Sequence, residues 1–218
     1  MRKLSLFSIL AVMLLTLSCN GSDPQPVIVT NPQPVIVAKI LSDQLADGDI
    51  ALDPVQRTYT ITNGPNTLYF GIDDSDPNLP EYRAFLDFPL DGSTGEAVIP
   101  LNARIVSATL EIFINEVSFA PNVPALLDFV SYPIAGLRAE DFDSAPFLSQ
   151  SLDFFASDVG HFVSIDVTPL MQDAQSLDLT DFQLRFVLDF DVNIGFAGIE
   201  DLPSDPNTAP LLTVRYRL

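Results

Sequence analysis

The stretch His161–Met171, HFVSIDVTPLM, changes its hydrophobic period half-way along. Apolar and polar residues alternate from Phe162 to Val167, which predicts a strand with one buried face. At Thr168 the alternation stops, and a hydroxyl residue followed by proline is typical of a helix N-cap with Pro at the first helical position. We therefore expect a strand that ends in a short helical corner running to Gln172 or Ala174.

Short alternating runs separated by turn residues lie on both sides of this corner. They cover residues 59–62, 67–72, 83–88, 105–117, 126–132, 182–190, 193–197 and 211–218, with a looser segment at 135–155. Many short strands of this kind are typical of an all-β sandwich or barrel. The predicted fold class is all-β, a jelly-roll-like antiparallel β-sandwich with one short helical corner.

The run that begins at Phe182 indicates which side chains face the core. Phe182, Leu184, Phe186 and Leu188 share one phase of the alternation, and Arg185 lies on the other. Burial of such apolar side chains contributes roughly 1.5 to 3 kcal/mol each. We expect this row to be intolerant of charge, and we expect Arg185 to face solvent.

Acidic residues outnumber basic residues by 29 to 10 in the 218-residue chain. Arg2 and Lys3 belong to the leader, so its removal leaves 8 basic against 29 acidic residues, a formal charge of about −21. Such a surface repels nucleic acid and bare anionic membranes. The charge therefore excludes nucleic acid as a partner and otherwise indicates solubility.

Residues 1–19 have the pattern of a secretory signal. Met1–Lys3 is positively charged, and Leu4–Leu17 is apolar but too short to span a membrane comfortably. The end, Ser18-Cys19, resembles a bacterial lipoprotein signal, in which the cysteine is lipidated and becomes N-terminal after cleavage. The resemblance implies a lipid-anchored protein of the bacterial cell envelope, at the outer membrane or cell surface. The alternative is an ordinary cleaved signal that leaves Cys19, the only cysteine, as a free thiol.

A direct repeat follows the cysteine. The sequence PQPVIV occurs at Pro24–Val29 and again at Pro32–Val37. Prolines at this density favour an extended, semi-rigid spacer. We therefore divide the chain into a signal peptide (1–18), a tether (19–37) and one domain (38–218). The start of the domain stays open between Val35 and Ile50, because the second VIV could already be an edge strand.

Four segments together carry a family resemblance: residues 83–90, 105–112, 165–170 and 210–216. In this order they resemble the DNRLRE-type β-sandwich domains, relatives of alginate-binding carbohydrate-binding modules of secreted and surface proteins. The resemblance implies a jelly-roll-like fold and sugar binding. The family's middle loop usually carries tryptophans, whereas the comparable stretch 137–146 has none.

The sequence lacks the usual signs of hydrolytic chemistry. A catalytic triad needs a base beside its nucleophile, and the only histidine is His161 at a strand start. There is no Gly-x-Ser-x-Gly motif, and Lys39 is the only lysine beyond the leader. We expect no catalytic residues and no enzymatic activity.

The sequence favours metal binding over catalysis. Asp73, Asp74 and Asp76 cluster in a loop and offer the oxygen ligands that Ca²⁺ prefers. No cofactor is required, and a structural Ca²⁺ ion is the one candidate. The spacing lacks the EF-hand pattern, so a solvated acidic turn is the alternative.

Aromatic side chains supply the candidate ligand-binding residues. The chain has no Trp, and most of its 16 Phe fall on the apolar phase of strands. Tyr69, Tyr82 and Tyr132 are therefore the candidate sugar-binding residues, with core packing as the alternative for each.

Two functions follow from these observations. The missing tryptophans and the negative charge favour a non-catalytic, lipid-anchored module with a structural or adhesive role, whose partners are the membrane and a surface protein. The alternative is a carbohydrate-binding module for an extracellular polysaccharide, assisted by Ca²⁺.

Overall fold

The computed structural model describes residues 33–95, 98–189, 195–202 and 208–218, and Gln33–Leu218 form one compact unit. The predicted signal peptide, Cys19 and the tether up to residue 32 lie outside the described residues. None of the helices in the described residues has the length and hydrophobicity needed to span a membrane.

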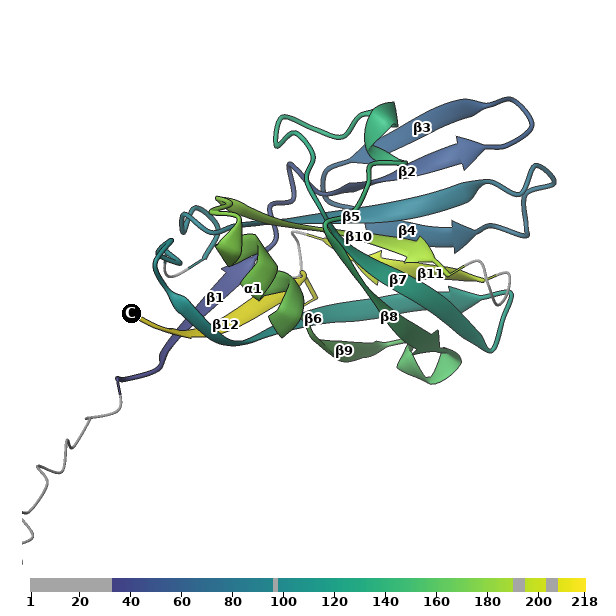
Figure 1. Ribbon diagram of the computed structural model, residues 1–218. Coiled ribbons are helices and arrows are strands. Elements are labelled where there is room, and N and C mark those ends of the chain that lie inside the picture. The colour runs from purple at the N-terminus through teal and green to yellow at the C-terminus, as the bar shows by residue number, and fades with distance from the viewer. Residues whose placement is uncertain (1–32, 96–97, 190–194, 203–207) are drawn as a thin grey trace, which may run out of the picture. The chain divides into compact units, whose positions relative to one another are not determined.

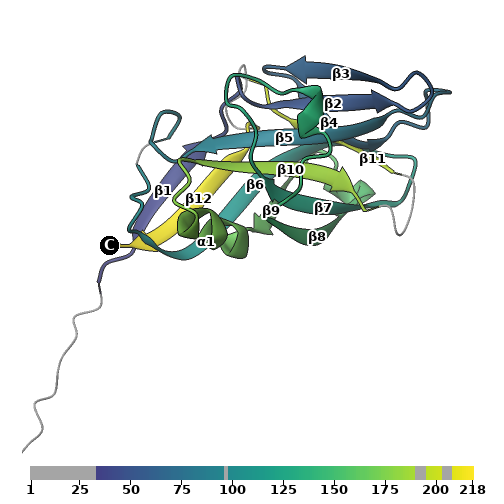
Figure 2. The same ribbon diagram turned by 45° about the horizontal axis from the view of Figure 1, so that its top comes forward.

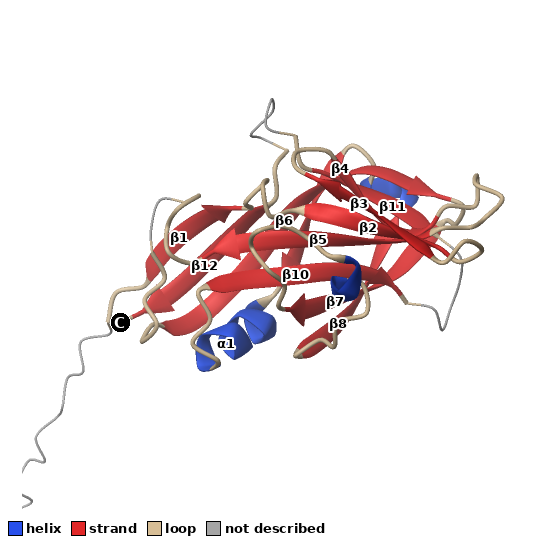
Figure 3. Ribbon diagram, turned by 90° about the horizontal axis from the view of Figure 1, so that it is seen from above, coloured by secondary structure: helices blue, strands red, loops and turns tan. Residues whose placement is uncertain are grey.

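Strands make up most of the described chain (Figure 3). They are β1 (Ile36–Leu41), β2 (Gly48–Asp53), β3 (Thr58–Asn63), β4 (Thr67–Ile72), β5 (Glu81–Pro89), β6 (Arg104–Ser118), β7 (Asn122–Val130), β8 (Leu148–Phe155), β9 (His161–Asp166), β10 (Asp181–Leu188), β11 (Phe196–Glu200) and β12 (Leu211–Arg217). One α-helix, α1 (Thr168–Ser176), and two short 3₁₀ helices, η1 (Ala139–Asp141) and η2 (Ala156–Asp158), complete the set. The predicted all-β class is confirmed.

The strands form one curled antiparallel sheet. Its order is β1-β12-β6-β11-β4-β5-β10-β7-β8, while β2 pairs with β3 and β5, and β9 pairs with β6. Figures 1 and 2 show β6, β9 and β12 on one side and β5, β7 and β10 on the other. The long strand β6 pairs with β12 over its first half and with β11 over its second, so the sheet turns a corner along it. The result is the expected sandwich-like arrangement.

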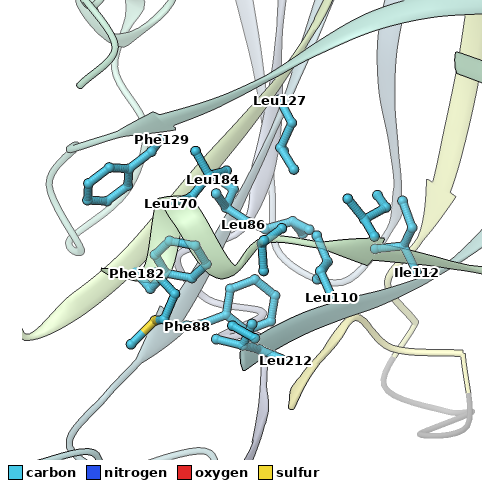
Figure 4. Packing of buried hydrophobic residues seen from close by; sticks show 14 of the residues in the cluster. Leu86, Phe88, Leu110, Ile112, Leu127, Phe129, Leu170, Phe182, Leu184 and Leu212 are labelled. Atoms are coloured by element: carbon cyan, nitrogen blue, oxygen red, sulfur yellow. The ribbon is translucent and has the colours of Figure 1, made fainter. Parts of the chain in front are cut away.

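The main core fills the space inside the curl (Figure 4). Leu110 and Ile112 of β6 meet Leu86 and Phe88 of β5, and Phe182 of β10 stacks near them. The predicted inward row of β10 is confirmed, because Phe182, Leu184, Phe186 and Leu188 are all buried.

A second apolar cluster lies on the other face of the same strands. It consists of Ile50, Phe85, Val130, Tyr132, Leu137 and Phe142. The segment between β7 and β8 supplies Leu137 and Phe142, and it therefore covers a face that the sequence pattern assigns to solvent.

Arg185 lies beneath this covering segment, so the expectation that it faces solvent is wrong. Its side chain forms a buried ion pair with Asp128 and donates to the carbonyl oxygens of Asp141 and Phe142. A charge is tolerated here because several acceptors surround the guanidinium.

The corner after β9 is present, with one correction. Helix α1 begins at Thr168, which makes Val167 the N-cap, and no side chain caps it. The hydroxyl of Thr168 instead accepts the N–H of Ala108 and donates to Asp166. Thr168 thus ties the corner to β6, and Pro169 still lies in the first turn, as expected.

The two ends of the described unit meet at one edge. Strand β1 starts at Ile36 and runs antiparallel to β12, so that Ile36 pairs with Tyr216. The second VIV triplet therefore enters the sheet, and β12 ties the carboxyl-terminal residues to β1 and β6.

Candidate functional site: an aromatic hollow beside β4 and β5

Tyr69 of β4 and Tyr82 of β5 lie side by side. Leu68 and Phe70 are buried in the core, so strand alternation places Tyr69 on the opposite face of β4. The register pairs Tyr82 with Gly71, two residues from Tyr69. The rings meet edge to face with their centroids 6.1 Å apart. Two of the three predicted tyrosines therefore share one place on the fold.

Two phenylalanines that the sequence did not indicate extend this aromatic surface. Phe196 of β11 stacks on Tyr69 at 5.0 Å and meets the Tyr82 ring edge-on at 5.4 Å. Phe119 follows β6, is 46% exposed and lies 6.2 Å from Phe196. The sequence carries no signal for this cluster, because β4, β5, β6 and β11 meet only through sheet pairing.

A glycine leaves room for the Tyr69 ring. Gly198 is the register partner of Tyr69, and a Cβ added at Gly198 would lie 3.1 Å from Cε1 of that ring. The same Cβ would lie still closer to Oδ1 of Asn115, so a side chain at Gly198 would crowd both Asn115 and the ring.

Tyr69 and Tyr82 form the wall between two open hollows. One has a volume of about 350 Å³ and is lined also by Asp49, Thr62, Asn66 and Thr67. The other, of about 460 Å³, is lined also by Asp73, Ser75, Glu116, Ser118, Phe119 and Phe196. None of these lining residues is basic. The site combines flat aromatic surface with carboxylates, hydroxyls and one amide.

Asp49 forms a polar feature of the smaller hollow. It is only 2% exposed, its Oδ2 accepts the N–H of Tyr69 at 3.1 Å, and its Oδ1 has no hydrogen-bond partner. Burial raises the pKa of Asp49 to about 6. A buried acceptor without a partner is costly, and the hydroxyl of Thr62, which lines the same hollow and lowers the pKa of this carboxyl, is a side-chain donor beside it.

Both phenols keep their protons at neutral pH. Burial, followed by the charge of Glu116, raises the pKa of Tyr69. Burial, followed by the charge of Asp73, raises the pKa of Tyr82. Each hydroxyl therefore stays neutral and can both donate and accept hydrogen bonds.

The predicted metal loop borders the larger hollow through Asp73, but its carboxylates serve the loop itself. Oδ1 of Asp73 accepts the N–H and the hydroxyl of Ser75, and Oδ1 of Asp76 accepts the N–H of Asn78. Asp74 is exposed. In the described part of the chain, no three His, Cys, Asp or Glu side chains gather where they could hold a metal ion.

Tyr132 is not part of the site, which corrects its prediction as a ligand-binding residue. It is 6% exposed and packs edge-on against Phe85 in the second cluster, with centroids 5.4 Å apart. Its chain position just beyond β7 places it under the covering segment, where no surface ligand reaches it.

No protein-family model matches the chain, and no curated protein matches it. The likeness to DNRLRE-type domains, drawn from four strand segments, therefore stays a prediction.

Proposed function

We propose that this chain is a non-catalytic module of the bacterial cell envelope that binds a polysaccharide in the hollow beside Tyr69 and Tyr82. The observation that carries the proposal is the pair of neutral phenols, Tyr69 and Tyr82, which lines both hollows. A sugar ring has an apolar face and a rim of hydroxyl donors. The aromatic rings can stack on the apolar face of the sugar. Asp49 and Asn66 can accept hydrogen bonds from its hydroxyl groups.

The charge of the hollow selects among sugars. Asp49, Asp73 and Glu116 line it, and no basic side chain does. A uronate polymer such as alginate would meet charges of its own sign. The proposed ligand is therefore a neutral polysaccharide, which departs from what the alginate-binding relatives imply.

This proposal reverses the order of the two functions favoured by the sequence. The missing tryptophans argued against sugar binding, but a half-buried tyrosine pair backed by Phe196 offers a comparable flat surface. Adhesion remains the broader role, and it would act through binding to a polysaccharide. The proposed lipid on Cys19 would hold the protein at the membrane.

The test is retention of the purified chain in native gels that contain one polysaccharide each. Neutral glucans, mannans and xylans are compared with alginate and pectate. We expect retardation by a neutral polymer, reduced at least tenfold in apparent affinity by Tyr82→Ala and by Tyr69→Ala. Tyr59→Ala is the matched control, because Tyr59 is a surface tyrosine of β3 that does not line the hollow.

Folding of each variant is checked by its melting temperature, and Asp49→Asn tests the hollow without changing its volume. Retardation that survives both tyrosine substitutions would place the site elsewhere. Failure of every polymer to retard the chain, with a surface protein co-purifying instead, would restore the structural role.

A further inference from the structure

A group of buried acids lies outside the aromatic hollow, where the β1–β2 loop meets the end of β11. Asp47 and Asp201 are both fully buried, and Asp87 of β5 is 1% exposed. They are far apart in the chain. The pairing of β2 with β5 brings Asp47 to Asp87, and backbone hydrogen bonds of Asp47 with Gly64 and of Asp201 with Asn66 hold both at the β3–β4 loop.

Their oxygens are incompletely satisfied. Oδ1 of Asp47 accepts the N–H of Asp87 at 2.6 Å, but Oδ2 of Asp47 and both oxygens of Asp201 have no hydrogen-bond partner. The hydroxyl of Ser42, 5% exposed, lies close enough to lower the pKa of Asp47, but neither it nor Oδ2 of Asp87 has a hydrogen-bond partner. Buried polar atoms are nearly always paired in proteins, so five such atoms on neighbouring side chains indicate a missing partner.

Within the described residues, no ion pair joins a positive side chain to these acids. The arginines in the ion pairs of the described residues are Arg83, Arg138 and Arg185, and they pair with other carboxylates. Burial and then the charge of Asp201 raise the pKa of Asp47 well above its usual range. Burial raises the pKa of Asp201 to about 6. As separate anions, the two carboxylates would be costly to bury.

We propose that Asp47 and Asp201 hold a divalent cation, of which Ca²⁺ fits best, together with the hydroxyl of Ser42. The unpartnered atoms are all oxygens, and Ca²⁺ is a hard cation that takes six to eight oxygen ligands in flexible geometry. A proton shared between Asp47 and Asp201 would satisfy one oxygen of each and leave the remaining Asp201 oxygen and Ser42 without partners. One cation can take oxygens of Asp47, Asp201 and Ser42 as ligands at the same time.

The neighbouring cavity supplies access and further ligands. It has a volume of about 450 Å³. Ser42, Asp43, Gln44 and Leu45 of the β1–β2 loop line it, together with Leu41, Pro65, Thr94 and Ala209. Gln44 approaches the Asp201 carboxyl closely enough to lower its pKa without completing a hydrogen bond to either oxygen. A flip of its amide would turn the carbonyl oxygen to the cation. Water from the cavity can occupy the remaining positions.

The site differs from the predicted loop Asp73–Asp76 and does not depend on sugar binding. Its role is to join the β1–β2 loop to the end of β11, and thereby to hold the first strands onto the sheet.

The experiment measures the melting temperature and the calcium stoichiometry of the purified chain at pH 7.5, first with chelator and then with Ca²⁺ added. We expect one ion bound and a rise of about 5 to 10 °C at a hundredfold excess over Kd. Asp201→Asn and Asp47→Asn should abolish both the bound ion and the rise. The matched controls Asp73→Asn and Asp76→Asn should keep them.

Loss of calcium binding in the loop controls, or its persistence in both Asp47→Asn and Asp201→Asn, would overturn the proposal. The proposal would also be overturned if the chain bound no Ca²⁺ at millimolar concentration and had a higher melting temperature at pH 5 than at pH 8. That result is expected if Asp47 and Asp201 share a proton. If the Asp47 and Asp201 variants do not fold, equilibrium dialysis of the wild-type chain against Ca²⁺ tests whether an ion is bound. Absence of a bound ion contradicts the proposal.

Discussion

Arg185 of β10 and Asp128 of β7 are register partners on neighbouring strands, and Nη2 of Arg185 lies 2.6 Å from Oδ2 of Asp128 with both side chains buried. The guanidinium also donates to two carbonyl oxygens of the segment that covers it. This pair therefore fastens the β7–β8 segment to the outer face of the sheet.

Arg185→Asp should destabilise the fold strongly. It removes the partner of a buried carboxylate and places a second negative charge beside it, so we expect a loss of about 3 to 5 kcal/mol or more. Chemical denaturation measures this loss. Arg138→Asp is the control, because the Arg138–Glu140 pair is exposed and its loss costs at most about 1 kcal/mol. Equal midpoints for the two variants would show that the covering segment is not held by Arg185.

Phe186→Ala tests the inward row of β10. Phe186 is fully buried and stacks on Phe70 at 5.5 Å, so its truncation leaves a cavity and should cost about 3 to 5 kcal/mol. Phe162→Ala removes a ring of the same size that is 50% exposed, and it should cost far less. The comparison uses thermal melts of both variants, and similar losses would mean that the inner face of the sheet has been assigned wrongly.

Binding in the aromatic hollow should depend on pH through Asp49. Its pKa is raised to about 6, so the carboxyl is protonated at pH 5 and ionised at pH 7.5. An ionised acceptor forms the stronger hydrogen bond to a sugar hydroxyl, and affinity should rise over this interval. Gel retardation at several pH values measures the effect. Asp49→Asn should bind more weakly and without this rise; an unchanged pH profile in that variant would remove Asp49 from the site.

Cys19→Ser tests the anchor. Lipid chains contribute about 0.8 kcal/mol for each buried methylene group, so the wild-type chain should sediment with membranes and the variant should become soluble. Cell fractionation measures the distribution, with Ser22→Ala as the control in the same tether. Identical distribution of wild type and Cys19→Ser would contradict lipid anchoring.

Much of the fold follows from the sequence because strand periodicity is a local property. Alternation predicted the inward row of β10 and the end of β9 at a helical corner. It missed β8, whose residues are mostly exposed and half of them polar, so that they show little apolar alternation. It also shifted the helix cap by one residue, since the hydroxyl of Thr168 bonds to β6 instead of to its own helix.

The sequence by itself thus determined the all-β class and the phase of the core strands. Only the tertiary structure decided what those residues meet. The segment after β7 covers one sheet face, which buries Arg185 and Tyr132 although their pattern suits a surface. Sheet pairing also brings Phe196 to Tyr69, and Asp201 to Asp47. Such contacts join residues distant in the chain, and local periodicity carries no information about which distant strands will pair.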